Sequence, residues 1–194
     1  RAAASDAVVR RRGRARQQLT RKRACLTLDR TIRLMPWYQF FNSLLFWQAV
    51  WFLYFQANLS GAEAIILYSV YDIATTLLEV PSGYFSDRIG RRLTLMLSAV
   101  CSVLGCLALA FGGSFAVYAL GQSLIGAGSA FKSGTDSALL YEALDATGRA
   151  EEIEAQELRV WRFTLAGFAV SAVSGGAMAM WSATLPFYAT ASAF

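Results

Sequence analysis

The amino-acid sequence predicts an all-α membrane protein whose helices cross a lipid bilayer in alternating directions. Hydrophobic residues make up 56% of the 194 residues and charged residues only 16%, below the roughly 25% of a typical soluble domain. Several uncharged runs reach the roughly 20 helical residues that a bilayer core requires. Basic residues gather in alternate connections between these runs. These three observations favour a membrane-embedded bundle over a soluble domain.

Residues 1–33 are expected to form a basic cytoplasmic tail. Of the 18 Lys and Arg residues, 11 fall within residues 1–35. A basic arm can bind nucleic acid. This one directly precedes a membrane-length apolar run, so a role in membrane orientation is the better interpretation. We therefore expect a lipid bilayer, and no nucleic acid, as its partner.

Residues 34–194 are predicted to form a transmembrane bundle. Its first run, from Leu34 to Ala62, carries no charge, and Trp37 and Tyr38 would anchor its start at the interface. Glycine-containing turns and polar connectors separate the later runs. The predicted spans cover about 36–57, 62–85, 92–111, 115–140, 160–181 and 185–194, the last of them incomplete.

The distribution of basic residues predicts the orientation of these spans. All basic residues except Lys132 lie in the N-terminal segment or in the connections that follow the second and fourth spans. The three intervening turns contain none. By the positive-inside rule, this alternation predicts a multi-pass protein of the cell membrane with a cytoplasmic N-terminus.

The connection after the second span has an unusual composition. It reads GYFSDRIGRR, with the pattern G-x-x-x-D-R-x-G-R-R formed by Gly83, Asp87, Arg88, Gly90, Arg91 and Arg92. Glycine lets helices approach closely or a tight turn form, and an aspartate can cap a helix or pair with arginine. A generic cytoplasmic loop would need the arginines but not the fixed spacing of glycine and aspartate.

This pattern resembles the signature loop of the major facilitator superfamily of secondary transporters, and it lies in the family's place between the second and third spans. The resemblance implies an N-terminal six-helix bundle of that fold, truncated within the sixth span, with a missing C-terminal six-helix half as partner. It also implies that the loop is a conformational latch. Asp87 would meet a helix of the other half, and Arg91 would pair with Asp136 at the cytoplasmic end of the fourth span.

The resemblance further implies that the first and fourth helices line a central cavity. Asn42 and Gln48 are therefore candidates to contact substrate. Gln122 occupies the position where the fourth-helix motif of the family often has an arginine, so the proton-coupling role of that arginine cannot be transferred. The many aromatic residues of the first span face lipid or core in one interpretation and cage an aromatic or cationic substrate in the other.

Asp72, Glu79 and Lys132 are charged residues within predicted spans, where each costs roughly 2.5–3.5 kcal/mol on insertion scales. Glu79 and Lys132 should lie at similar depth, which suggests an ion pair; alternatively, each reaches the interface or a polar partner separately. Asp72 lies near mid-membrane. It could carry a proton, or it could be a structural residue hydrogen-bonded within its own bundle.

Small residues at intervals of four predict close helix packing in the fourth and fifth spans. The candidates are Gly126, Gly134, Gly167, Gly175 and Gly176. In the family, the fifth span of drug/proton antiporters carries a Gly-Pro-x-x-Gly-Gly motif. This chain keeps Gly175 and Gly176 but has Ser171-Ala172 in place of Gly-Pro, which weakens the case for a standard antiporter.

The composition argues against an enzyme. The chain has no His and three Cys, so a His-based triad or a common zinc site is not expected, and no phosphate-binding loop is visible. We expect no cofactor and no metal. The predicted function is a secondary active transporter that moves a small solute by alternating access, with possible proton coupling. The alternative is a truncated, non-transporting membrane half-protein or scaffold.

Overall fold

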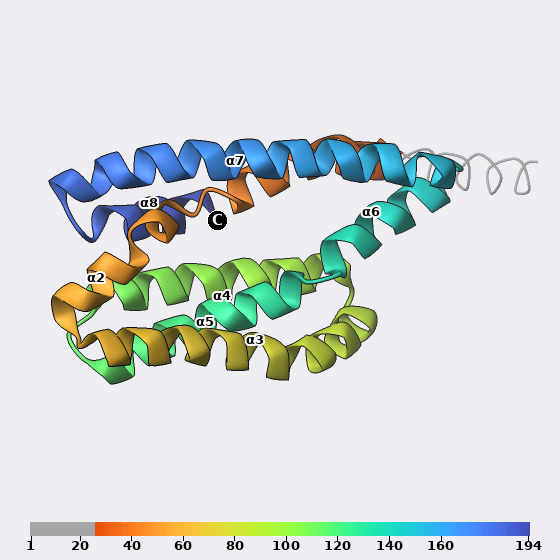
Figure 1. Cartoon of the computed structure of the whole chain (residues 1–194). Coiled ribbons are helices and arrows are strands. Elements are labelled where there is room, and N and C mark those ends of the chain that lie inside the picture. The colour runs from red at the N-terminus through yellow and green to blue at the C-terminus, as the bar shows by residue number, and fades with distance from the viewer. Residues whose placement is uncertain (1–25) are drawn as a thin grey trace, which may run out of the picture.

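The computed structural model describes residues 26–194, and every regular element within them is a helix, which confirms the predicted all-α fold class (Figure 1). Most of the predicted tail lies outside the described residues. The first helix covers residues 26–42. It is followed by η1 (Phe46–Ala49), α2 (Trp51–Asn58), α3 (Gly61–Ile89), α4 (Arg91–Phe111), α5 (Phe115–Lys132), α6 (Thr135–Ala146), η2 (Ala150–Glu152), α7 (Ile153–Trp181) and α8 (Leu185–Ala193).

The first helix includes residues 26–33, which the sequence assigned to a polar tail. Ile32 and Met35 follow each other at helical spacing and are buried against Leu140 and Leu144 of α6. Burial of this apolar stripe extends the helix to the N-terminal side of the uncharged run, because amphipathic helices are stabilised by burying one face. The helix therefore passes the predicted boundary between tail and bundle.

The predicted first span, 36–57, is not one helix. The helical backbone stops after residue 42 and resumes as the short helices η1 and α2. Ser43 and Leu44, within this first break, are both buried. Non-helical backbone at membrane depth is tolerated where protein covers it. Here Thr190 of α8 accepts a hydrogen bond from the backbone N–H of Phe46 at 3.0 Å.

The predicted fourth span, 115–140, is also divided. α5 ends at Lys132 and α6 begins at Thr135. Gly134, between them, has a φ of 71°, a left-handed conformation that glycine adopts without steric cost. The spacing of small residues predicted a packing role for Gly134, but a Cβ there would meet nothing within 4 Å. Its role in the structure is therefore to make the second break.

The predicted second and third spans are continuous helices. α3 starts at a capping box, in which Ser60 and Glu63 bond each other's backbone N–H groups. It ends before Gly90, whose φ of 95° allows the chain to turn directly into α4. The fifth span is a helix too, although α7 begins seven residues before the predicted start at 160.

The helices form two groups, which Figure 1 shows one above the other: α3, α4 and α5 in one, and the first helix, α7 and α8 in the other. α2 and η1 connect the groups, and α8 packs against α4. An aromatic core joins them, in which Tyr54, Phe55 and Phe187 are buried together with Leu67 and Leu109. Tyr54 fixes this core by donating a hydrogen bond to the carbonyl of Leu109 at 2.8 Å.

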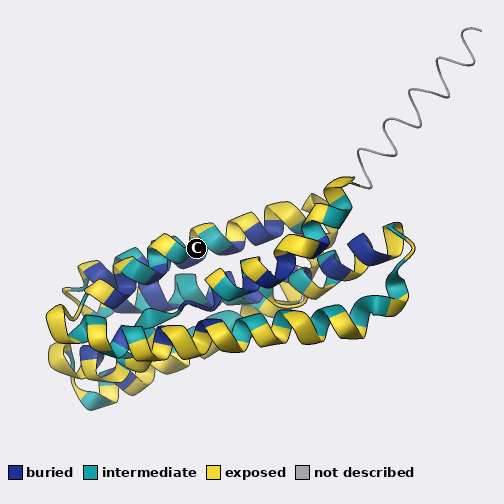
Figure 2. Ribbon diagram, turned by 90° about the horizontal axis from the view of Figure 1, so that it is seen from above, coloured by how far each residue is buried: buried dark blue, intermediate teal, exposed yellow. Residues whose placement is uncertain are grey.

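Figure 2 shows exposed residues along the outer faces of the helices, and many of the exposed side chains are large and apolar. Val80 of α3 and Met180 of α7 have 84% and 87% of their surface exposed. Such surfaces are rare on soluble monomers and fit lipid contact. Within the described residues, three helical segments are long and apolar enough to cross a bilayer: Gly61–Ile89, Arg91–Phe111 and Ala150–Trp181.

Glycines allow α7 to lie directly on the backbone near the first break. A Cβ added at Gly167 would lie 2.6 Å from the carbonyl oxygen of Phe40, and one at Gly175 would be closer still to the carbonyl oxygen of Phe46. Gly126 of α5 packs in the same way against the Tyr71 carbonyl of α3, at 2.7 Å. A Cβ at Gly176 would meet nothing within 4 Å, so its assignment as a packing residue is wrong for the described chain.

These contacts predict opposite effects for two neighbouring substitutions. Gly175→Ala should destabilise the bundle by about 1–3 kcal/mol, because its methyl group would overlap the Phe46 carbonyl. Gly176→Ala should be neutral or should stabilise by up to about 1 kcal/mol, since alanine is the better helix former. Thermal unfolding of both variants in detergent measures this difference. Equal unfolding temperatures would contradict the close packing of α7.

Candidate functional site

The turn between α3 and α4 is tied to α6 through Arg91. Its guanidinium forms ion pairs with Asp87 at 2.8 Å and with Glu142 of α6 at 3.1 Å. It also donates a hydrogen bond to Ser86 Oγ at 2.8 Å, and Ser86 Oγ accepts another from Thr135 at 3.2 Å. This network, which we call the latch, joins the end of α3, the start of α4 and two positions of α6.

The acidic partner of Arg91 is not the one expected from the sequence. Asp136 accepts hydrogen bonds from Gln39 Nε2 of the first helix and from the Ser137 backbone N–H. Glu142 takes the place beside Arg91 instead. The difference arises from the break at Gly134, which starts α6 anew and leaves Asp136 in its first turn, beside the first helix.

The other residues of the signature loop have separate contacts. Arg92 donates to Thr31 Oγ1 of the first helix at 3.2 Å. The Arg88 guanidinium lies 5.3 Å from the centre of the Tyr84 ring, within the range of a cation–π contact. Gly90 makes the turn, whereas a Cβ on Gly83 would meet nothing within 4 Å. Any close neighbour of Gly83 therefore lies outside the described residues.

A second ionic group fixes the connection between α6 and α7. Arg149 pairs with Glu152 at 2.6 Å and with Asp29 of the first helix at 3.4 Å. Its hydrogen bonds to Glu152 are the main reason that the pKa of the Arg149 guanidinium is raised. The first part of the first helix is thus held by Arg92 and Arg149 together, a role that was not expected for either residue.

The two helix breaks meet at one side-chain contact. Lys132, the last residue of α5, donates a hydrogen bond from Nζ to Asn42 Oδ1, at the end of the first helix. The predicted Glu79–Lys132 ion pair is not formed: Glu79 Oε1 instead accepts from Ser133 Oγ at 3.4 Å. The unexpected break at 43–45 accounts for this, because it brings the Asn42 amide to Lys132.

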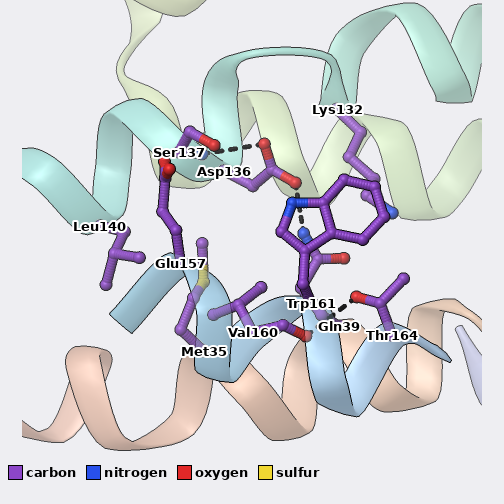
Figure 3. Close-up of a pocket in the computed structure, with 10 residues that line it drawn as sticks. All are labelled: Met35, Gln39, Lys132, Asp136, Ser137, Leu140, Glu157, Val160, Trp161 and Thr164. Carbon is purple, nitrogen blue, oxygen red and sulfur yellow. Dashed lines mark hydrogen bonds between the residues drawn. The ribbon is translucent and has the colours of Figure 1, made fainter. Parts of the chain in front are cut away.

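Beside this contact lies a cavity of about 320 Å³, which we call the charged cavity (Figure 3). The first helix, the junction of α5 and α6, and the first half of α7 enclose it. Its polar lining comprises Gln39, Lys132, Asp136, Ser137, Glu157 and Thr164, and its apolar lining comprises Met35, Leu140, Val160 and Trp161. Of these residues, the sequence analysis had singled out Lys132 and Asp136 alone.

A smaller cavity of about 160 Å³ lies on the other side of the first break, and we call it the aromatic cavity. Trp47, Trp51, Tyr68 and Tyr71 line it together with Leu45, Gln48, Gln122 and Ile125. The rings of Trp51 and Tyr68 stack with centroids 5.4 Å apart. The buried atoms Gln122 Oε1 and Trp47 Nε1 have no hydrogen-bond partner among the described residues, so both are available to a ligand or water.

The three substrate candidates therefore belong to two places. Gln48 and Gln122 line the aromatic cavity, whereas Asn42 is committed to Lys132. Asp72 lies on the exposed face of α3, where no hydrogen bond or ion pair reaches it from the described part of the chain. The internal hydrogen bond that one interpretation of Asp72 required is thus absent from residues 26–194.

The interrupted helices, the apolar outer surface and the latch define a polytopic membrane protein of the helical-bundle type. The sequence profile of the sugar (and other) transporter family matches residues 26–184, and the chain belongs to this family. This confirms the resemblance to the major facilitator superfamily and identifies the fold as a helical bundle of that superfamily. The chain is thus a membrane protein of a family that transports sugars and other solutes. Comparisons with curated proteins and with solved structures found no match.

The latch geometry predicts which acidic residue is coupled to Arg91. In a double-mutant cycle, Arg91→Gln and Glu142→Gln should show a coupling energy of about 0.2–1 kcal/mol, the range of partly exposed ion pairs. Arg91→Gln and Asp136→Asn should be additive. Unfolding free energies in detergent measure both cycles. A larger coupling to Asp136 than to Glu142 would refute this arrangement.

The contact between the breaks predicts a second asymmetry. Asn42→Leu should destabilise the bundle by about 1–3 kcal/mol, because it leaves the Lys132 ammonium without its acceptor. Glu79→Gln should cost much less, since Glu79 is exposed and its bond to Ser133 is long. The control is the charge swap Glu79→Lys with Lys132→Glu. Recovery of stability in the swap, relative to both single variants, would favour the ion pair instead.

Proposed function

We propose that this chain is the N-terminal bundle of a secondary active transporter that moves a small polar solute across the cell membrane by alternating access. Secondary transporters commonly bind solute where helices are interrupted, because the freed backbone and the helix ends supply polar groups at membrane depth. The observation that carries the proposal is the hydrogen bond between Lys132 and Asn42, which joins two such interruptions beside the charged cavity.

The latch supports the same mechanism. Asp87 is bound by Arg91 through one carboxylate oxygen, and its side chain is 66% exposed. It can therefore interact with a second six-helix bundle in one state of the cycle while Arg91 holds α4 against Glu142. Release of this contact would free the two bundles to rock against each other. No chemical conversion of the solute is part of this proposal.

The basic residues support a cytoplasmic N-terminus in this transporter. The latch and the Arg149 group lie at the same end of the bundle as the start of the first helix, as their contacts with Thr31 and Asp29 require. Clusters of arginine are retained on the cytoplasmic side of membranes. The solute would then enter or leave at this end of the bundle, through the cavities beside the breaks.

Asp72 is the candidate for proton coupling. It is an exposed carboxylate on a helix with apolar neighbours such as Ile73 and Leu77, and an ionisable residue in such a place commonly marks an ion pathway. In a coupled transporter it would face the second bundle and exchange a proton during the cycle.

The test is transport in lipid vesicles by the full-length polypeptide that contains this chain. Solute uptake or efflux should depend on the protein and should respond to an imposed proton gradient. Asp72→Asn should reduce the response of the solute flux to the proton gradient at least tenfold, while exchange of solute across the membrane continues. Unchanged gradient dependence in the variant would assign Asp72 a structural role, and protein-independent fluxes would refute the transporter.

A further inference from the structure

The charged cavity contains an ammonium group that forms no ion pair with any described residue. Lys132 is largely buried, and its one hydrogen bond within the described chain goes to the neutral Asn42 amide. None of the ion pairs among residues 26–194 includes Lys132, so neither Asp136 nor Glu157 lies within 4 Å of its nitrogen. An ammonium has three N–H donors. At least one therefore remains for a group inside the cavity.

The same cavity contains acceptors that lack donors. Glu157 of α7 makes no hydrogen bond or ion pair with any described residue, although it lines the cavity. The side chain of Gln39 is only 7% exposed, and its Oε1 is buried without a hydrogen-bond partner. A buried acceptor without a donor costs free energy. Glu157, whose carboxylate lines the cavity, would therefore gain from a ligand that brings N–H groups.

The two unpaired charges lie apart in the cavity. Figure 3 shows Lys132 and Glu157 well separated, on α5 and α7. Asp136 lies nearer the middle and already accepts hydrogen bonds from Gln39 and Ser137. The cavity therefore offers a positive group on one element and a free negative group on another, with apolar surface from Val160 and Trp161 beside them.

Three ligand classes can be compared on this basis. A neutral polyol would satisfy hydrogen bonds but would leave Lys132 and Glu157 without ion-pair partners in a membrane-embedded site, where charge is costly. A simple amine would leave Lys132 without an ion-pair partner, and a simple carboxylate would leave Glu157 without one. A ligand with both groups would meet both needs.

We propose that the charged cavity binds a small zwitterion that carries an ammonium and a carboxylate, as amino acids do, with the carboxylate at Lys132 and the ammonium at Glu157. The volume of about 320 Å³ lies at the lower end of small-molecule sites and suits a molecule of this size. The proposal rests on the proposed transport function, because it names the substrate class of that site.

The experiment measures ligand-induced thermal stabilisation of the purified full-length protein in detergent, with each of the twenty standard amino acids at millimolar concentration. For each amino acid that stabilises, its decarboxylated amine and its deaminated carboxylate are tested beside it, with glucose as the neutral polyol. We expect at least one amino acid to raise the unfolding temperature, and its amine and carboxylate counterparts to bind at least tenfold more weakly. No effect of any amino acid, or an equal effect of glucose, overturns the proposal.

Two variants locate the binding site. Glu157→Gln should weaken amino-acid binding at least tenfold while changing the affinity of the carboxylate counterpart little, because it removes only the partner of the ammonium. Lys132→Gln should weaken amino-acid binding at least tenfold while changing the affinity of the amine counterpart little, because it removes only the partner of the carboxylate. The glutamine amide keeps a donor for Asn42. Glu154→Gln, one turn earlier on α7 and outside the cavity, is the matched control and should bind as the wild type does. Unaltered binding in both cavity variants would place the ligand elsewhere and overturn the proposal.

These results remain distinct from those of the transport assay. Vesicles that transport another solute class, with no amino acid bound, would retain the proposed function and refute the zwitterion. Amino-acid binding without any flux in vesicles would retain the charged cavity as a zwitterion site and refute transport. Because selectivity is measured first on the wild-type protein, a variant that fails to fold does not remove the test.

Discussion

The structure depends on one constraint: inside a hydrocarbon layer, every backbone N–H and C=O group must find a partner within the protein. Continuous helices meet it locally, as α3, α4 and α7 do. The two breaks meet it only through neighbouring elements. At the first, Thr190 accepts the N–H of Phe46, and α7 approaches so closely that glycine alone fits at position 175. The position of α7 and α8 is thus required by an interruption in another helix.

The same constraint explains why polar function gathers at the breaks. A helix end carries backbone groups without intrahelical partners, and polar side chains beside it can be stabilised there more readily than in the middle of a helix. Asn42 and Lys132 stand at two such ends and satisfy each other. The two cavities lie on either side of the first break, one with charged and one with aromatic lining. A transporter with an uninterrupted first span would have neither in this form.

The sequence predicted the helical class and three helices long enough to cross a bilayer, because these follow from apolar length. The fixed spacing of the motif also indicated the loop in which Arg91 forms its ion pairs. The sequence did not predict the first break, because residues 43–45 contain neither Gly nor Pro. The helix is interrupted there beside tertiary contacts with α7 and α8, such as the hydrogen bond between Phe46 and Thr190. Gly134 lies at the second break. It also belongs to a row of small residues at intervals of four, and for that reason a packing role was predicted for it. The predicted pairing of Glu79 with Lys132 arose from treating these spans as straight helices. The pairing of Arg91 with Asp136 was implied by the resemblance to the family.

The glycines of α7 restrict how this helix can move. If α7 turned about its own axis by one residue, Gly176 would replace Gly175 against the Phe46 carbonyl, and the fit there would survive. The same turn would bring Phe168 to the position of Gly167, where even a methyl group would lie 2.6 Å from the Phe40 carbonyl. Rotation of α7 about its own axis is therefore sterically forbidden while the helix lies on the backbone of Phe40 and Phe46. Any conformational change that keeps these two contacts must move α7 together with the first helix and η1.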